Sequence, residues 1–271
     1  MSPSPRYSDQ YGPWALVTGA AMGLGAEFAR QLAMRGLNLV LADVNAEHLH
    51  TTAAAIAAET GVQIRPLVCD LSASDGLLPL IEAVSSLDIG LLINNAGISC
   101  VGDFLDVPLE KHLKILELNA RVPLVLAHHC GARMRERGRG GIVFVSSGSA
   151  MVGTSSVSAY SATKAFNLNL GEALWEELRS SGVDVLSSIV GATDTPGWRA
   201  ENPNPAAKIW PAVLSPAETV RETLGALGKT PSFFPGAQYR LAMFVTTRLM
   251  SRPAAVRVIG AEMRKRYKII K

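Results

Sequence analysis

The chain has 271 residues, of which 48% are hydrophobic and 18% charged, and its formal net charge is +3. This length and composition suit one globular domain with a sizeable core, because α/β domains often reach roughly 200–250 residues. The small net charge does not suggest the concentrated basic surface of a nucleic-acid binder, so we expect no nucleic-acid partner.

Short runs rich in Val, Ile and Leu alternate with amphipathic stretches of helix length. The runs are apolar throughout, as is typical of strands buried on both faces of a parallel sheet. This alternation predicts an α/β fold: a single-domain, doubly wound parallel sheet of the Rossmann type with helices on both faces. In chain order we expect strands at Trp14–Thr18, Leu37–Ala42, Gln63–Cys69, Ile89–Ile93, Gly141–Ser146 and Val183–Val190, and helices at Gly23–Arg35, Ala46–Thr60, Ser74–Ser86, Leu109–Arg137 and Ser158–Ser180.

The two ends of the chain differ from this pattern. Residues 1–12 are polar and Pro-rich, which predicts a flexible N-terminus before a domain over 13–236. Residues 237–271 are expected to be a basic helical extension of the same domain. From Arg240 to Lys271 nine Lys and Arg face one acid, Glu262, so this segment carries +8 and the rest of the chain −5. Packing on the domain is favoured for the extension, and peripheral contact of 240–271 with an anionic membrane is the alternative.

A glycine-rich turn joins the first strand to the first helix. Glycine lets the backbone approach a pyrophosphate, and the helix N-terminus supplies unpaired N–H groups. The turn is therefore expected to bind a dinucleotide through Gly19, Met22, Gly23, Leu24 and Gly25.

Asp43 stands at the end of the second strand, about twenty residues past the turn. An acid there accepts hydrogen bonds from the adenosine ribose hydroxyls and repels a 2′-phosphate. Neither Met22 nor Val44 is basic, so the expected cofactor is NAD. The alternative for Asp43 is a helix cap, a role that Asn45 can also fill.

Tyr160 and Lys164 are four residues apart, which places them on one face of a predicted helix. A free phenol has a pKa of ~10, and a nearby cation favours its ionised form. Ser147 precedes Tyr160 by thirteen residues, at the carboxyl end of a predicted strand, where parallel sheets bind ligands. These three side chains predict proton transfer by Tyr160, with Ser147 orienting a substrate carbonyl oxygen.

With these motifs in this order, the chain resembles the short-chain dehydrogenase/reductase family over about Trp14 to Gly236. The resemblance implies that Tyr160 is the general acid/base, and that Asn119 holds a water which links Lys164 to solvent. It also implies that Lys164 binds the nicotinamide ribose. The remaining cofactor contacts implied are Asp70, Leu71, Asn95, Ala96, Gly97, Val190, Gly191, Thr193 and Thr195. Val190 departs from the family pattern, which usually has proline there, so the path of the next turn is open.

The expected function is NAD-dependent interconversion of a secondary alcohol and a ketone. The Pro-rich stretch Gly191–Pro216 is expected to be a lid, because long irregular loops are often functional. Its Trp198 and Trp210, together with Ser149, are expected to line an apolar or bulky substrate such as a steroid-like, lipid-like or aromatic alcohol. The alternatives are an NADP-dependent carbonyl reductase, a non-catalytic nucleotide sensor and a membrane-associated module.

Other features set the expected surroundings of the protein. The three cysteines are an odd number without metal-ligand spacing, which predicts a reducing, cytoplasmic location and no metal. No apolar stretch approaches the ~20 residues of a membrane-spanning helix. The helices expected at Leu109–Arg137 and Ser158–Ser180 correspond to those that form the dimer contact in the family, so a homodimer or homotetramer is expected.

Overall fold

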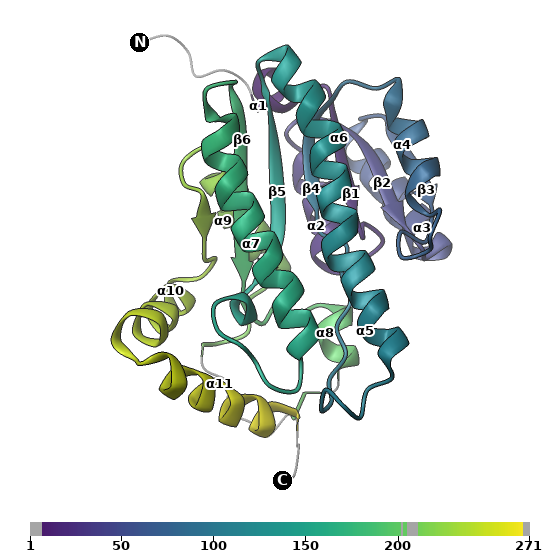
Figure 1. The fold of residues 1–271 in the computed structure, drawn as a ribbon. Helices are drawn as coiled ribbons and strands as arrows, with labels where there is room; N and C mark the ends of the chain where they lie inside the picture. Colours follow the sequence, from purple (N-terminus) through teal and green to yellow (C-terminus); the bar gives the residue numbers. More distant parts are fainter. Residues whose placement is uncertain (1–6, 202, 205–210, 268–271) are drawn as a thin grey trace.

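The computed structural model describes residues 7–201, 203–204 and 211–267. Within them, seven parallel strands form one sheet in the order β3-β2-β1-β4-β5-β6-β7 (Figure 1). The predicted doubly wound α/β sheet is confirmed. The strands are β1 (Trp14–Thr18), β2 (Asn38–Asp43), β3 (Ile64–Val68), β4 (Ile89–Asn94), β5 (Gly140–Ser147), β6 (Val183–Val190) and β7 (Ser232–Phe233).

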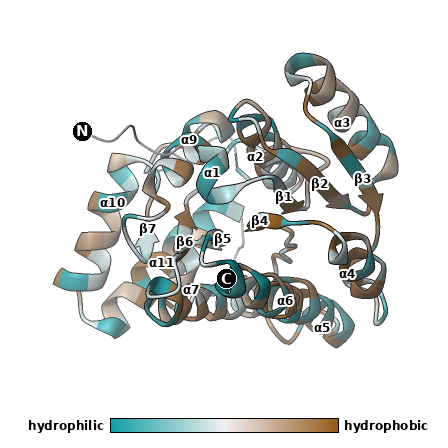
Figure 2. Cartoon of the chain, turned by 90° about the horizontal axis from the view of Figure 1, so that it is seen from above, coloured by the Kyte–Doolittle hydropathy of each residue, from teal (hydrophilic) through white to brown (hydrophobic). Residues whose placement is uncertain are grey.

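Helices cover both faces of the sheet (Figure 2). On one face lie α2 (Gly23–Ala33), α3 (Ala46–Thr60) and α9 (Pro216–Ala226). On the other lie α4 (Leu77–Ser85), α6 (Val122–Arg137) and α7 (Ser158–Arg179). Because the chain reverses its direction of travel between β1 and β4, the carboxyl ends of these two strands border a crevice, the usual ligand site of such sheets.

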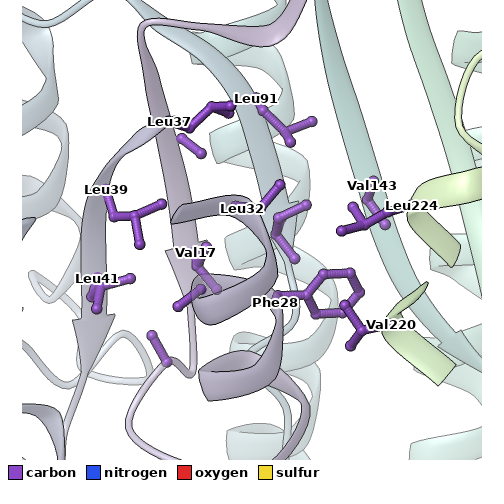
Figure 3. Packing of buried hydrophobic residues seen from close by; sticks show 14 of the residues in the cluster. Val17, Phe28, Leu32, Leu37, Leu39, Leu41, Leu91, Val143, Val220 and Leu224 are labelled. Atoms are coloured by element: carbon purple, nitrogen blue, oxygen red, sulfur yellow. The ribbon is translucent and has the colours of Figure 1, made fainter. Parts of the chain in front are cut away.

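Each face of the sheet has its own buried apolar cluster, which explains the continuous apolar strands. In β1, Ala15 and Val17 join the cluster on the α2 side, whereas Trp14 and Leu16 join the other. Figure 3 shows Phe28 and Leu32 of α2 packed with residues of the strands and of α9. Burial of this kind stabilises a fold by roughly 25 cal/mol per Å² of apolar surface.

The helix expected over Leu109–Arg137 is interrupted. It divides into α5 (Leu109–Leu116), a π-helical turn η1 (Glu117–Arg121) and α6. Pro123 has no N–H to donate to the carbonyl oxygen of Asn119 four residues earlier. That carbonyl instead accepts a hydrogen bond from the Asn167 side chain at 2.8 Å. The π-helical turn therefore takes the Asn119 carbonyl out of the regular hydrogen-bond pattern of the helix. Turns of this kind often occur at functional sites.

The predicted limits of several elements were wrong by one to three residues. Helix α2 ends at Ala33 instead of Arg35, and α4 begins at Leu77 instead of Ser74. Strand β7 was not predicted, because its two residues are too short to form a pattern.

Residues 7–12, the described part of the N-terminus that was expected to be flexible, are ordered. Tyr7–Tyr11 forms helix α1, and Tyr11 is buried. The Tyr11 hydroxyl donates to Asp184 at 2.7 Å, and the Gly12 N–H donates to the Ser8 carbonyl at 2.8 Å. The segment is fixed by a long-range hydrogen bond and by an aromatic ring in the core. The polar composition of residues 1–12 predicts neither contact.

The C-terminal extension packs on the domain. It consists of α10 (Ala237–Phe244), a π-helical turn η3 (Val245–Leu249) and α11 (Arg252–Tyr267). Tyr239 of α10 and Ala255 of α11 are buried. Arg252 of α11 donates to the Met151 carbonyl at 2.9 Å. None of the helices in the described part of the chain combines the length and hydrophobicity that a bilayer crossing requires.

Candidate active site

The glycine-rich turn is held in the conformation that the sequence suggested. Gly19 and Gly23 have positive φ angles of 65° and 61°. A Cβ on Gly25 would lie 1.9 Å from the Gly19 carbonyl oxygen, so this position requires glycine. The N–H groups of Gly19 and Ala20 donate to the Ala42 carbonyl, which fixes the turn against β2.

The start of helix α2 fits a pyrophosphate. Met22 occupies the N-cap position and makes no side-chain hydrogen bond to the described helix. The first N–H groups of α2 thus lack a side-chain cap, as in helices that bind phosphate. A Cβ on Gly23 would lie 3.2 Å from Thr195, so the turn also faces the segment after β6. Leu24 packs against the core at the same helix start.

Asn95 and Thr18 brace the turn from β4. The Asn95 side chain donates to the carbonyls of Thr18 and Gly19 at 2.8 and 3.0 Å. The buried Thr18 hydroxyl accepts the N–H groups of Asn95 and Ala96, each at 3.1 Å. The structure therefore brings Asn95 and Ala96 to the turn, as expected; the bracing role of Thr18 was not predicted.

Asp43 lies beside the turn. One carboxylate oxygen accepts the Ala21 N–H and the other accepts the Asn45 N–H, both at 2.9 Å. Asn45, and not Asp43, caps helix α3, because its side chain accepts the His48 N–H. The alternative role of Asp43 as the helix cap is therefore wrong, and each of its oxygens keeps capacity for one more hydrogen bond.

Asp70 and Leu71 follow β3 with different environments. Leu71 is buried. Asp70 is exposed, and hydrogen bonds from Ser72 hold the pKa of its carboxyl below the ordinary value, with Lys114 at 4.0 Å adding to this effect.

Ser147, Ser149 and Tyr160 gather at the carboxyl end of β5. Ser147 is the last residue of that strand, and its hydroxyl accepts the Ser149 hydroxyl at 3.1 Å. Tyr160 lies in the first turn of α7 and is partly buried. Burial raises the pKa of Tyr160 to about 12, against the opposing effect of a hydrogen bond with Ser147, while the charge of Glu201 raises it further.

Lys164 is buried beneath Tyr160. Its Nζ atom lies 5.6 Å from the centre of the Tyr160 ring and donates to the Val145 carbonyl at 2.8 Å. Burial lowers the pKa of Lys164 to about 8. The expected lowering of the Tyr160 pKa is not found in the protein alone, because burial outweighs any effect of this cation.

Asn119 lies close to Lys164 around Gly97. A Cβ on Gly97 would lie 3.2 Å from Lys164 Nζ and 3.3 Å from Asn119 Oδ1, so both side chains border this glycine. Asn119 is fully buried, and its amide pairs with the backbone N–H and carbonyl of Ile98. Gly97 itself is exposed and opens this group to the cleft.

The segment after β6 is shaped by a residue of the C-terminal extension. Val190 is buried, and a Cβ on Gly191 would lie 2.2 Å from the Tyr239 ring. The Tyr239 hydroxyl accepts the Ala192 N–H at 2.9 Å. Thr193 is buried and forms an isolated β-bridge with Leu214. Thr195 is the N-cap residue of the short helix α8 (Pro196–Ala200). Tyr239 therefore fixes the path of the turn after Val190, which the sequence did not predict.

The two tryptophans of the expected lid have different outcomes. Trp198 lines a hollow with Asp194, Val213, Leu214, Ser215 and Pro216, and this hollow does not include Ser147, Tyr160 or Lys164. Its contact with substrate stays a prediction, because the hollow lies at the start of α9. Trp210 lies outside the described residues.

A polar group beside Tyr160 was missed entirely. Glu201 follows α8, and its carboxylate accepts hydrogen bonds from the Ser99 and Tyr267 hydroxyls. These three residues come from separate parts of the chain without a shared motif. No spacing in the sequence could have joined them.

Comparisons with known proteins identify the family of this chain. The family model described as short chain dehydrogenase matches residues 13–206. The 7beta-hydroxysteroid dehydrogenase of Clostridium sardiniense is 31% identical over 237 residues, which cover 88% of this chain and 90% of that protein. The human inactive hydroxysteroid dehydrogenase-like protein 1 is 37% identical over 183 residues, which cover 66% of this chain but only 56% of that relative.

Solved structures give the same picture. A structure solved to explain 7beta-hydroxysteroid dehydrogenase stereoselectivity superposes with a TM-score of 0.89 and 27% identity, covering 94% of this chain and 100% of the other. A short-chain dehydrogenase from Sphingobium yanoikuyae in complex with NADPH gives a TM-score of 0.78 at 30% identity, covering 88% and 94%.

Proposed function

The chain belongs to the short-chain dehydrogenase family, and from this we propose that it interconverts a secondary alcohol and a ketone, with Tyr160 as general acid/base. The observation that carries the proposal is the placement of Tyr160 between the Ser147 hydroxyl and the buried ammonium group of Lys164. This is the arrangement that proton transfer to or from a substrate oxygen needs.

In the oxidation direction the side chains divide the work. Tyr160 takes the proton of the substrate hydroxyl, and Ser147 donates a hydrogen bond to the same oxygen. When bound, the nicotinamide supplies hydride transfer and, in its oxidised form, a positive charge. That charge is needed near Tyr160, because burial raises the pKa of the phenol to about 12 in the protein alone.

Lys164 and Asn119 are proposed to return the proton to solvent. Lys164 has a pKa lowered to about 8 by burial, so it can change its protonation state near neutral pH. Asn119 offers its backbone carbonyl, whose second lone pair remains beside the bond from Asn167 and can hold a water. Lys164 is also proposed to bind the nicotinamide ribose.

The cofactor is proposed to be NAD. Asp43 keeps a free acceptor position on each oxygen beside the glycine-rich turn, which suits ribose hydroxyls and repels a 2′-phosphate. The relative from Sphingobium yanoikuyae binds NADPH, so NADP is the alternative within this family. The other proposed cofactor contacts are, in chain order, Gly19, Met22, Gly23, Leu24, Gly25, Asp70, Leu71, Asn95, Ala96, Gly97, Val190, Gly191, Thr193 and Thr195.

The substrate class is proposed from a relative. One relative is a 7beta-hydroxysteroid dehydrogenase, which supports a bulky alicyclic alcohol or ketone. A panel of steroid, alicyclic and aromatic alcohols, assayed with both NAD and NADP, tests the function. Turnover of at least one bulky secondary alcohol with NAD is expected. A clear preference for NADP would overturn the proposed role of Asp43.

A non-catalytic nucleotide-binding role is the competing function, because one relative is described as inactive. Catalysis is favoured because the chain has all four side chains of the proposed reaction, Ser147, Tyr160, Lys164 and Asn119. Absence of turnover across the panel, with NAD binding intact by calorimetry, would favour the competitor.

The C-terminal extension supports a second proposal, peripheral contact with an anionic membrane. Leu241, Phe244 and Leu249 are 59, 57 and 69% exposed, and they recur at helical spacing around Arg248. Exposed apolar and basic residues together favour a negatively charged bilayer surface. Sedimentation with phosphatidylserine liposomes tests this: the protein should pellet, and a variant with serine at the three apolar positions should not. Assembly without liposomes that is lost in the serine variant would contradict it and point to a subunit contact at these three positions.

The assembly and the location remain proposals. Leu109, Leu113 and Leu116 of α5 are each more than half exposed and belong to the first of the two helices expected to form the dimer contact. They favour a homodimer or homotetramer, which light scattering can distinguish. Cytoplasmic location is proposed from the three free cysteines.

A further inference from the structure

One acidic side chain beside the reaction centre has no part in the chemistry proposed above. Glu201 receives hydrogen bonds from Ser99, in the segment after β4, and from Tyr267, the last residue of α11. The carboxylate thus joins three segments that are far apart in the sequence. Figure 1 shows α11 and α8 at the same end of the molecule as the start of α7.

The carboxylate is held in place by more than its own two bonds. The Asn204 N–H donates to the Arg266 carbonyl at 2.7 Å, which ties the segment after Glu201 to the end of α11. The start of α11 contacts the loop before Tyr160, because Arg252 donates to the Met151 carbonyl at 2.9 Å. The middle of the helix also lies on this loop, since a Cβ on Gly260 would lie 3.0 Å from the Ser155 hydroxyl. Helix α11 therefore spans from the loop before Tyr160 to the lid segment and fixes Glu201 between them.

The charge of Glu201 affects the ionisation of Tyr160. Burial is the largest cause of the raised pKa of Tyr160, and the negative charge of Glu201 raises this pKa further. The charge of Tyr160 likewise contributes to the raised pKa of Tyr267. Ser99 lies two residues after Gly97, the exposed glycine that borders Lys164. The hydrogen bond from Ser99 therefore holds the carboxylate against the segment that borders Lys164, next to the space in which a substrate would meet Tyr160.

The chemistry of a carboxylate decides what it accepts. It is an acceptor only, with about four lone-pair positions, and two of them are used by Ser99 and Tyr267. The remaining positions can take a hydroxyl or N–H group of a ligand. A second negative charge at this place is repelled in a partly dehydrated cleft, where charges interact more strongly than in water.

We propose that Glu201, clamped by Ser99 and Tyr267, determines substrate specificity by admitting uncharged or hydrogen-bond-donating substrates and excluding substrates with an anionic group near the reacting carbon. The inference rests on the proposed alcohol–ketone chemistry at Tyr160. It adds a class of substrate to that reaction: neutral alcohols with a further donor group, in preference to hydroxy acids.

A pair of probes that differ only in charge tests the proposal. We suggest methyl 3-hydroxycyclohexanecarboxylate and its free acid, each assayed with NAD for kcat/KM and, by calorimetry, for binding to the NAD-loaded protein. The wild type should favour the ester by tenfold or more. Glu201→Gln keeps the size and an oxygen acceptor, so it should raise kcat/KM and affinity for the acid about tenfold and change the ester by less than threefold.

Two further variants separate specificity from structure. Tyr267→Phe removes one clamp and should shift the ester-to-acid ratio in the same direction by a smaller factor. Glu262→Gln, at the one acid of α11, is the matched control and should leave the ratio unchanged. In Glu201→Gln the pH at which kcat/KM for the ester rises should move downward, because the negative charge near Tyr160 is gone; a purely structural role would not move it.

The possible failures are distinguishable. An ester-to-acid ratio that is the same within twofold in wild type and Glu201→Gln, in binding and in turnover, overturns the inference, as does failure of the wild type to bind either probe. Binding that prefers the ester without any turnover of the panel of alcohols contradicts the proposed reaction but keeps the selectivity of Glu201.

Discussion

The Nζ atom of Lys164 lies 5.6 Å from the centre of the Tyr160 ring and donates a hydrogen bond to the carbonyl of Val145 in the sheet. The cation is therefore under the ring and does not bond the phenol oxygen directly. Because burial raises the pKa of Tyr160 to about 12 in this geometry, ionisation of the phenol depends on further charge from the bound nucleotide.

Replacement of the phenol tests whether this arrangement is catalytic. Tyr160→Phe removes only the hydroxyl, so we expect kcat to fall by about 10²–10⁴-fold, the usual contribution of a general acid or base. Affinity for NAD, measured by calorimetry, should change by less than threefold. Turnover equal to that of the wild type would contradict the proposed mechanism.

Lys164 is expected to destabilise the fold near neutral pH. Its pKa falls from 10.5 to about 8 on burial, so between these values the unfolded chain binds more protons and stability rises with pH. Below pH 8 the buried charge costs up to about 3 kcal/mol. Lys164→Met should therefore raise the free energy of unfolding by about 2 kcal/mol at pH 7, after loss of the hydrogen bond to Val145.

Denaturant titrations at pH 7, 8.5 and 10 measure this effect. The advantage of Lys164→Met should shrink above pH 8 and vanish by about pH 10, because the wild-type lysine is then neutral in the fold. Lys229→Met, at an exposed lysine, is the matched control and should show no such trend. An advantage that is independent of pH would contradict the assigned cause.

Local patterns explain why much of this site could be predicted from the sequence. Tyr160 and Lys164 are one helical turn apart, and Ser147 ends a strand of a parallel sheet, so their meeting follows from the periods of helix and strand. The interruption at Asn119 had a readable signal in Pro123, which lacks the N–H that a regular helix needs.

The contacts that could not be predicted depend on tertiary packing. Tyr239 reaches Ala192 over 47 residues, and Tyr267 reaches Glu201 over 66. Neither pair has a periodic spacing, and no motif marks either of the two tyrosines in the extension. The same reason applies to Tyr11, whose polar surroundings suggested a flexible terminus although its ring is part of the core.

Asp43 is expected to set the choice of cofactor. Asp43→Asn removes the negative charge but keeps an oxygen that can accept the Asn45 N–H. We expect kcat/KM with NADP, relative to that with NAD, to rise at least tenfold, which corresponds to about 1.4 kcal/mol. Asp75→Asn, at an exposed acid, is the control. A relative preference that stays within twofold would show that another group discriminates against the 2′-phosphate.

Gly191 and Tyr239 are expected to be coupled. A Cβ on Gly191 would lie 2.2 Å from the Tyr239 ring, so Gly191→Ala forces either the turn after β6 or helix α10 to move. Overpacking of this kind costs about 1–3 kcal/mol of stability. Gly153→Ala is the matched control, because no atom lies within 4 Å of its Cβ position, and it should change stability by less than about 0.5 kcal/mol.

The double variant Gly191→Ala/Tyr239→Leu measures the coupling. Leucine removes the ring that meets the new methyl group, and it also removes the hydroxyl that accepts the Ala192 N–H. In a denaturant-based cycle the double variant should be at least about 1 kcal/mol more stable than the sum of the two single effects predicts, because the clash is absent. Additive effects would mean that the turn relaxes away from α10 on its own. The path of the backbone toward Thr195 would then not depend on the C-terminal extension.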